Sequence, residues 1–126
     1  MIFGIGTDLV ELARFEKLFA RHGERLAGRM LSEDELPEFS GIADPARFIA
    51  KRFAAKEAFA KAVGSGLRAP VSLRRIGVTH DRLGKPSLKF DDVLRAHLAQ
   101  LGITAHHLSV SDERDMIVAF VVLETI

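Results

Sequence analysis

A carboxylate, two lysines and two glycines lie close together between Phe53 and Gly66, in the stretch FAAKEAFAKAVGSG. If this stretch is helical, Glu57 and Lys61 lie four residues apart on one face, where such a pair commonly forms a surface ion pair worth a few tenths of a kcal/mol. The same two groups, with Lys56 beside them and glycines where the helix would end, also suit the binding of a diphosphate. The pattern therefore indicates either a plain ion pair or an anion site.

Two cations of this region fall where apolar side chains are expected. At about 100° of turn per residue, Arg52 and Lys56 lie inside the apolar arc formed by Phe48, Ile49, Phe53, Phe59 and Val63. Unpaired burial of a charged group is strongly unfavourable. We therefore expect both side chains to meet an anion, or to extend along a groove so that their charges reach solvent.

A further acidic residue lies in the N-terminal motif GIGTDLVEL, residues 4 to 12. The apolar residues before it predict a buried strand over residues 2 to 8, which ends at Asp8 just before an acidic helix start. A single aspartate at the end of a strand is typical of a metal ligand, because hard cations such as Mg²⁺ prefer carboxylate oxygens. Asp8 is therefore a candidate metal ligand.

Together, the two motifs resemble those of a known family. GIGTDLVEL with Arg14, followed by RFAAKEAFAKAVGSG from Arg52 to Gly66, is similar to the holo-acyl-carrier-protein synthases, which are small 4′-phosphopantetheinyl transferases. A Gly-Lys-Pro tripeptide at residues 84–86 and a closing strand with His-Leu-Ser at residues 107–109 extend the resemblance over essentially the whole chain.

The resemblance implies a reaction and its cofactors. Coenzyme A would donate its 4′-phosphopantetheine arm to a serine hydroxyl of an acyl carrier protein, with release of adenosine 3′,5′-bisphosphate, in support of fatty acid biosynthesis. The family pattern places Asp8 and Glu57 on a magnesium ion, which typically takes one or two carboxylates together with substrate phosphates and water. It makes Glu57 and Lys61 the catalytic residues, with the Lys61 ammonium neutralising phosphate oxygens.

The coenzyme contacts that the resemblance implies are more numerous. Gly64 and Gly66 would let backbone N–H groups approach the coenzyme, whereas a hairpin turn explains the tripeptide at 84–86 almost as well. The full set of expected coenzyme-binding residues is Arg52, Lys56, Lys61, Gly64, Gly66, Gly84, Lys85, Pro86 and His107.

The sequence leaves open which base takes the proton of the attacking serine. Glu57 acting through a water is one candidate. His107 is another, because an imidazole with an unperturbed pKa near 6.5 suits proton transfer at neutral pH, although we interpret it as a coenzyme-binding residue. Many relatives carry a second histidine where this chain has Asp112, so no role of that histidine carries over.

Three arginines are candidates for binding the carrier protein. Arg14, Arg21 and Arg25 lie at i, i+7 and i+11, close to one stripe of the first predicted helix. Such a stripe is either a solvated basic face or a docking surface for the carrier protein, which the resemblance implies to be acidic. The resemblance also implies a homotrimer with shared active sites, and the alternating apolar residues from Val118 to Leu123 suit either that interface or an internal core.

Length and composition limit the other classes of function. The 126 residues suit one domain, 1–126, and the net charge of +1 argues against a nucleic-acid-binding module. There is no cysteine, and neither a signal peptide nor an apolar span of membrane length is recognisable, so we expect a cytoplasmic protein without membrane contact. The alternative to an enzyme is a coenzyme-binding module of the same fold that catalyses no transfer.

The elements that must position these residues follow from spacing and from helix-end signals. Ser32 with Glu35 fits a capping box that opens a short helix, and Asp44 followed by Pro45 suits the start of a long helix that ends near Val63. The elements together predict an α+β fold with an antiparallel sheet. Strands are expected over residues 2–8, 75–80, 87–90, 107–111 and 116–124, and helices over 11–22, after 32, over 45–63 and over 91–101.

Overall fold

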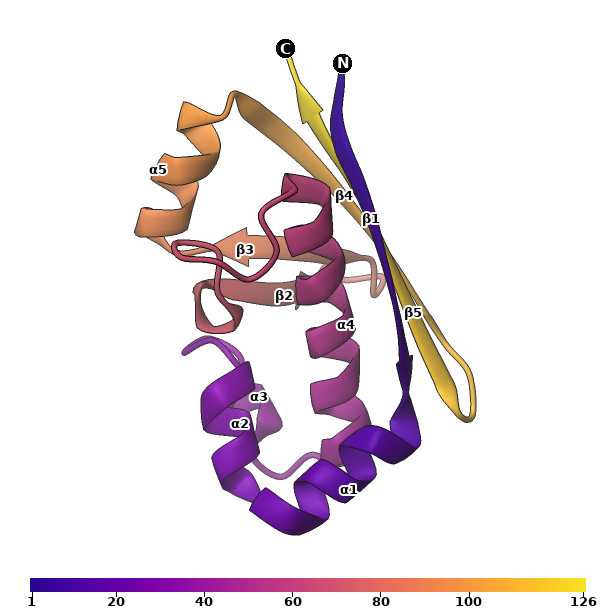
Figure 1. Cartoon of the computed structure of the whole chain (residues 1–126). Coiled ribbons are helices and arrows are strands. Elements are labelled where there is room, and N and C mark those ends of the chain that lie inside the picture. Colours follow the sequence, from indigo (N-terminus) through magenta and orange to yellow (C-terminus); the bar gives the residue numbers. More distant parts are fainter.

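One sheet and one long helix form the frame of the molecule. In the computed structural model, which describes all residues from 1 to 126, strand β5 lies between β1 and β4 in an antiparallel three-stranded sheet (Figure 1). Helix α4 packs across one face of this sheet, mainly against β1 and β5. The bounds are Ile2–Glu11 for β1, Ile103–Asp112 for β4, Met116–Thr125 for β5 and Pro45–Val63 for α4.

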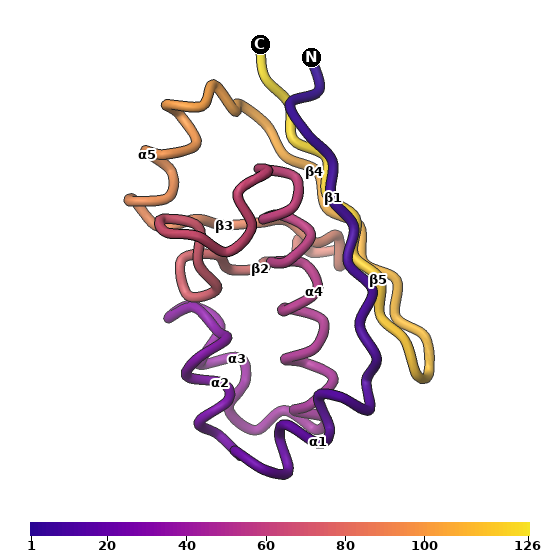
Figure 2. The backbone as a smooth tube through the Cα atoms, viewed as in Figure 1, coloured from indigo at the N-terminus to yellow at the C-terminus, as the bar shows by residue number.

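Three helices lie between β1 and α4 in the chain and gather at one end of α4 (Figure 2). They are α1 (Leu12–His22), α2 (Glu24–Met30) and the single turn α3 (Leu36–Phe39). Phe15 of α1 packs against Phe53 of α4, with ring centroids 5.1 Å apart. This contact attaches the helical end of the molecule to the frame.

The chain after α4 forms a second, two-stranded sheet. The 3-10 turn η1 (Leu73–Arg75) leads into the antiparallel hairpin of β2 (Ile76–His80) and β3 (Pro86–Phe90), and α5 (Asp92–Gln100) connects this hairpin to β4. The two termini lie side by side at one end of the main sheet, because β1 begins where β5 ends (Figure 1).

The hairpin is linked to the main sheet through His106 of β4. The Leu88 backbone N–H donates a hydrogen bond of 3.1 Å to Nε2 of His106, and the ring meets Phe90 edge-on with centroids 5.5 Å apart. Burial lowers the pKa of His106, and the neighbouring His107 lowers it further. The neutral imidazole, whose free nitrogen accepts this bond, is therefore the favoured form.

Helix α4 has the end signals that its sequence predicts. The Asp44 carboxylate accepts a hydrogen bond of 3.2 Å from the Arg47 N–H, and Pro45 opens the first turn. At the other end, Gly64 adopts a left-handed backbone with φ of 94°, which glycine accepts without strain. Many of the buried positions of the helix are alanines: Ala46, Ala50, Ala54, Ala55, Ala58, Ala60 and Ala62.

Strand β1 lies very close to α4, because Gly4 and Gly6 face the helix. A Cβ added to Gly6 would lie 2.7 Å from the backbone nitrogen of Ala62 and nearer still to the carbonyl oxygen of Ala58. A Cβ on Gly4 would overlap the carbonyl oxygen of Ala62. The two backbones therefore pack directly against each other, which only glycine permits here.

The structure confirms the predicted α+β fold with an antiparallel sheet and changes several bounds. Strand β1 continues to Glu11 and β4 already begins at Ile103, because both pair with β5 along most of its length. Helix α2 was not predicted, and Gly23, with φ of 59°, separates it from α1. None of the helices combines the length and apolar character that crossing a bilayer requires.

Candidate active site

Asp8 faces α4 from β1, and Lys61 in the last turns of the helix meets it. The Lys61 ammonium nitrogen lies 3.2 Å from Oδ1 of Asp8 and 3.0 Å from the backbone oxygen of Thr7. The Asp8 side chain is 15% exposed and that of Lys61 is 52% exposed. The two sequence motifs thus meet in an ion pair that is open to solvent on the lysine side.

Glu57 lies one turn before Lys61 and is partly buried. Burial raises the pKa of Glu57, and the charge of Asp8 raises it further, while the charges of Lys61 and Arg14 lower it. Two carboxylates that repel each other in this way are stabilised by a cation placed between them.

The donor set of Asp8 and Glu57 fits a magnesium ion. Mg²⁺ prefers hard oxygen ligands and usually takes one or two from the protein, with water and phosphate oxygens completing its coordination. No group of three or more histidine, cysteine, aspartate or glutamate side chains is arranged to hold a metal ion. An ion bound by these two carboxylates would therefore keep several positions for oxygens of a substrate.

Lys56 lies outside this site, because its side chain enters the core and meets Glu35. Its ammonium nitrogen is 2.6 Å from Oε1 of Glu35 and 2.7 Å from the backbone oxygen of Met30, and the two side chains are 0% and 2% exposed. Burial lowers the pKa of Lys56, and the charge of Glu35 opposes this. The expected anion is therefore a protein carboxylate. The prediction that Lys56 contacts the coenzyme is corrected accordingly.

Arg52 shares the same carboxylate. Its Nε lies 3.5 Å from Oε2 of Glu35, a terminal nitrogen donates to Glu38 at 3.1 Å, and the guanidinium lies over the ring of Phe48 at 4.0 Å. Arg52 nevertheless lines a cavity of about 110 Å³ together with Gly84 and Pro86. Its expected contact with the coenzyme stays a prediction.

Glu35 is an important residue for which the sequence suggested only a role in a capping box. Its carboxylate accepts hydrogen bonds of 2.9 Å from the backbone N–H groups of Ser32 and Val78. The Ser32 hydroxyl has no partner, so only half of the predicted capping box forms, and α3 begins at Leu36. One signal in the sequence pointed to such a residue: Arg52 and Lys56 lie within an apolar arc, and two buried cations need an anionic partner.

Lys85, Pro86 and His107 line a cavity of about 470 Å³ between the β2–β3 turn and β4, whereas Gly84 lines the smaller cavity beside Arg52. Gly84 has φ of 89° in this turn, and the Asp81 carboxylate accepts a hydrogen bond of 2.9 Å from the Lys85 N–H. His107 Nε2 lies 2.8 Å from the Glu124 carboxylate of β5. The structure thus brings Lys85, Pro86 and His107 to one cavity, and their contact with the coenzyme stays a prediction.

Asp8 and His107 lie on opposite faces of the main sheet. Side chains alternate along a strand, and Asp8 shares the face that packs on α4, whereas His107 lies on the outer face beside Glu124. The outer face also carries exposed apolar side chains. Ile5, Leu9 and Phe120 are 59%, 65% and 41% exposed. One chain alone therefore does not bring His107 to the proposed metal ligands.

Comparison with known proteins places these motifs in a family. A family model described as the 4′-phosphopantetheinyl transferase superfamily matches residues 4–121. The chain belongs to this superfamily. It is 62% identical over 124 residues to a holo-[acyl-carrier-protein] synthase of Laribacter hongkongensis, with 98% of this chain and 99% of that protein covered. The family membership predicted from the two motifs is confirmed.

Solved structures of 4′-phosphopantetheinyl transferases share the fold. The crystal structure of a holo-[acyl-carrier-protein] synthase from Neisseria meningitidis has a TM-score of 0.96 at 51% identity, covering 99% of this chain and 100% of that one. A holo-(acyl-carrier-protein) synthase from Bacillus anthracis, in complex with CoA (3′,5′-ADP), has a TM-score of 0.84 at 38% identity, covering 100% and 99%.

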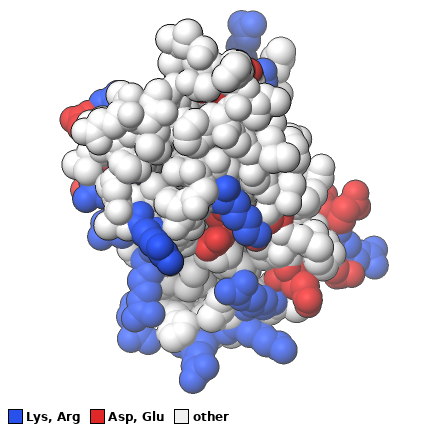
Figure 3. All heavy atoms as spheres, turned by 45° about the horizontal axis from the view of Figure 1, so that its top comes forward, with Lys and Arg blue, Asp and Glu red and all other residues white.

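The three arginines of this transferase that were expected on one helix lie on two. Arg14 and Arg21 are exposed on α1, whereas Arg25 belongs to α2. Arg14 and Arg21 line a groove of about 360 Å³ with Lys17. Figure 3 shows Lys and Arg gathered along the edge where α1 and α2 lie in Figure 1, and mostly uncharged surface above it. The predicted stripe is corrected to a basic edge formed by both helices.

Asp112, at the position where the resemblance implies a second histidine in many relatives, serves as a counter-ion. It forms an ion pair with Arg47 of α4, and Lys51 lies 3.6 Å from its other carboxylate oxygen. The backbone oxygens of Glu113 and Arg114 also accept hydrogen bonds from Arg47. In this chain, position 112 therefore holds the β4–β5 turn against α4.

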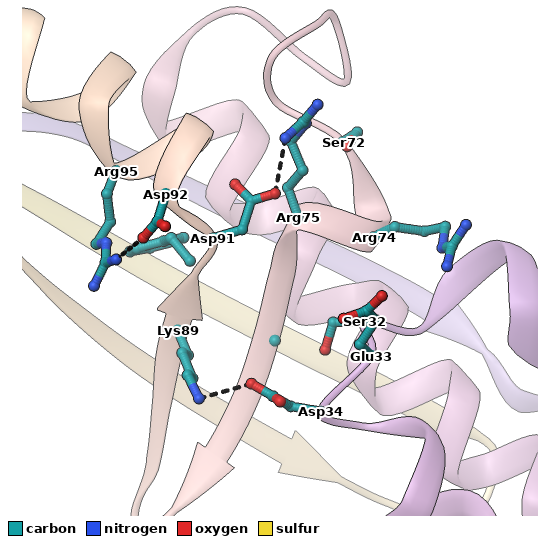
Figure 4. Close-up of a pocket in the computed structure, with 12 residues that line it drawn as sticks. Ser32, Glu33, Asp34, Ser72, Arg74, Arg75, Lys89, Asp91, Asp92 and Arg95 are labelled. Atoms are coloured by element: carbon teal, nitrogen blue, oxygen red, sulfur yellow. Dashed lines mark hydrogen bonds and ion pairs between the residues drawn. The ribbon is translucent and has the colours of Figure 1, made fainter.

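The largest cavity of the transferase, about 590 Å³, contains none of the predicted site residues. It lies between the loop after α2, η1 and the start of α5, and three of its four cations are paired with carboxylates (Figure 4). Four acidic and four basic side chains line it, so it has no excess of charge for an ionic ligand. The lining pairs are Arg75 with Asp91, Lys89 with Asp34 and Arg95 with Asp92.

Proposed function

We propose that this chain transfers the 4′-phosphopantetheine group of coenzyme A to a serine hydroxyl of apo acyl carrier protein, in a magnesium-dependent reaction. The products would be holo acyl carrier protein and adenosine 3′,5′-bisphosphate. The observation that carries the proposal is the meeting of Asp8, Glu57 and Lys61 where β1 packs on α4. Membership of the transferase superfamily supports the same reaction.

The roles of these residues follow from their positions. Asp8 and Glu57 would hold Mg²⁺, which when bound would polarise the diphosphate and stabilise charge on the departing bisphosphate. Lys61 uses two of its three N–H donors on Thr7 and Asp8, so the third can bind a phosphate oxygen. Gly64 and Gly66 lie just beyond Lys61, and both donate their N–H groups to the carbonyl oxygen of Ala60, at 3.1 and 3.3 Å. What they offer the coenzyme is therefore the absence of a side chain and not a free N–H.

The transfer forms one bond and breaks one. The serine oxygen bonds to the phosphorus that carries the pantetheine arm, and the bond from that phosphorus to the oxygen of the bisphosphate breaks. Positioning and charge stabilisation dominate such reactions. Two groups are candidates for taking the serine proton: a water held by Glu57, and His107, which within one chain lies on the other face of the sheet and is paired with Glu124.

We further propose that a second copy completes each active site, in a homotrimer. The support is that His107 lies on the opposite face of the sheet from Asp8, and that exposed apolar residues lie on this outer face. Light scattering on an active preparation tests this directly. A monomeric mass would reject the shared site.

A mixing experiment tests whether the site is shared. If Asp8→Ala and His107→Ala proteins are each weakly active, mixed and reassembled oligomers should regain activity, because some interfaces then combine an intact Asp8 with an intact His107. Activity that stays at the mean of the two variants would contradict a site built from two copies.

Intact-mass spectrometry of apo acyl carrier protein tests the transfer itself. The carrier should gain one phosphopantetheine with coenzyme A and Mg²⁺, and the gain should disappear with a chelator and in folded Asp8→Ala and Glu57→Ala proteins. Asp92→Ala, which removes an exposed carboxylate from α5, is the matched control and should retain transfer. No gain with several apo carriers would favour the alternative of a coenzyme-binding module without catalysis.

A further inference from the structure

Lys61 contacts Asp8, a proposed metal ligand, directly. It can therefore affect binding of the metal ion as well as binding of the phosphate. Its ammonium nitrogen is within 3.2 Å of Oδ1 of Asp8 and is fixed by the backbone oxygen of Thr7 at 3.0 Å. One oxygen of Asp8 is therefore already neutralised by a cation of the protein. A divalent ion that approaches Asp8 must share this carboxylate with the ammonium or displace it.

The effect of Lys61 on the ion depends on which other charges are present. Without a coenzyme, the ammonium and the divalent ion are like charges beside the same carboxylates, and the ammonium weakens binding of the ion. When a diphosphate is bound, its negative charges attract both cations, and the free N–H of Lys61 gains an acceptor. The same side chain then favours the complex.

We propose that Lys61 couples the two ligands, so that the divalent ion and the diphosphate of the coenzyme bind cooperatively and the bare ion binds weakly. This inference rests on the proposed function, because it assumes that Asp8 and Glu57 hold the ion. Coupling of this kind is reciprocal: the ion strengthens binding of the coenzyme by the same factor as the coenzyme strengthens binding of the ion.

Arg14 offers a matched control. Its charge also acts on Glu57, but its guanidinium forms no ion pair with a carboxylate and instead lies 5.5 Å from the ring centres of Phe15 and Phe53. Arg14→Met therefore removes a nearby positive charge without removing a contact to a metal ligand. Any general electrostatic effect of losing one cation will be seen in both variants.

The experiment is a titration of the protein with Mn²⁺, which carboxylate sites accept in place of Mg²⁺. Electron paramagnetic resonance measures the concentration of free Mn²⁺, with and without saturating coenzyme A. Without coenzyme A, Lys61→Met should bind Mn²⁺ roughly fivefold more tightly than the unchanged protein, which is the range of a single solvent-exposed ion pair. Arg14→Met should gain less. Lys61→Arg, which keeps the charge, should behave as the unchanged protein.

The response to coenzyme A gives the decisive comparison. In the unchanged protein, coenzyme A should tighten Mn²⁺ binding by roughly tenfold or more, within the usual range of coupling between two sites, and in Lys61→Met this gain should fall severalfold. A gain of equal size in both proteins, or equal Mn²⁺ affinities of Lys61→Met and Arg14→Met without coenzyme A, would overturn the coupling and leave the proposed function intact.

A second variant separates the two claims. Asp8→Asn should lose most Mn²⁺ binding whether or not coenzyme A is present. If Asp8→Asn binds Mn²⁺ as the unchanged protein does, the metal ligands of the proposed function are wrong and the coupling fails with them. Circular dichroism of each variant checks that the fold is retained.

Discussion

Replacement of Gly6 by alanine tests whether the direct contact of β1 with α4 positions the carboxylates. The added Cβ would lie 2.7 Å from the backbone nitrogen of Ala62 and nearer still to the carbonyl oxygen of Ala58. Favourable contacts between such atoms begin at about 3.5 Å, so the strand and the helix would have to separate by about 1 Å. Both neighbours are backbone atoms of a helix, and no side-chain rotation relieves the overlap.

This separation affects stability and the site together. Overpacking of a core contact costs about 1–3 kcal/mol of the free energy of unfolding, which urea denaturation measures. Asp8 lies two residues beyond Gly6 on the same face, so it would move away from Glu57 and Lys61. Because a misplacement of about 1 Å at a catalytic site lowers the rate roughly 100-fold, we expect a similar loss of kcat and a higher magnesium requirement.

Gly28→Ala is the control for Gly6→Ala. Gly28 lies within α2, and a Cβ there would meet no atom within 4 Å. Alanine is favoured over glycine in a helix by up to about 1 kcal/mol, so this variant should be as stable as the unchanged protein or more so, with unchanged magnesium dependence. If Gly6→Ala behaves like Gly28→Ala in both measurements, the argument from close packing is refuted.

Three further predictions concern other parts of the molecule. Glu35→Gln should lower the free energy of unfolding by about 3–5 kcal/mol in urea, because it leaves the charge of Lys56 buried without its partner; a loss below about 1 kcal/mol would contradict this. His106 has a lowered pKa in the folded chain, so the unfolded chain binds more protons as the pH falls below about 6.5 and the free energy of unfolding should decrease. In His106→Gln this free energy should decrease less steeply between pH 7 and 5. Equal slopes in the two proteins would argue against a neutral His106 in the folded chain. Arg14→Glu should raise the apparent KM for the carrier protein more than that for coenzyme A, with a weaker dependence on salt, because exposed charges are screened beyond about 8 Å at physiological ionic strength. Arg74→Glu, which reverses an exposed charge on η1 away from the predicted site residues, should leave both KM values unchanged. Identical carrier kinetics in the two variants would contradict the docking surface.

The sequence was sufficient for the parts of the site that depend on local pattern. Glu57 and Lys61 lie on one helix, whose start and end are marked by Asp44 and Gly64, so their shared face follows from spacing alone. Asp8 follows from its place in a strand that precedes a helix. The prediction that Asp8 lies beside Glu57 of this helix came from the family resemblance, because no spacing rule predicts which helix packs on a strand.

The parts that could not be predicted depend on contacts between distant segments. Glu35 and Lys56 are 21 residues apart, and the local pattern of Glu35 was fully explained by a capping box. Arg25 fits a stripe only if one helix continues through Gly23, and the backbone at this glycine ends the helix. His107 matched the family motif, but its place on the outer face follows only once the register of β4 with β5 is known.

Gly6 carries no functional group, and the path of the Lys61 side chain explains why it nevertheless belongs to the site. Two residues advance a strand by about 6.6 Å and four residues advance a helix by about 6 Å, so the contacts of Gly4 with Ala62 and of Gly6 with Ala58 stay in step. Helix side chains point back towards the N-terminus, and the Lys61 stem therefore passes Gly6 on its way to Asp8, with its Cβ only 3.0 Å from where a side chain at Gly6 would begin. Gly6 thus both admits the helix backbone and leaves room for the lysine that reaches the carboxylate.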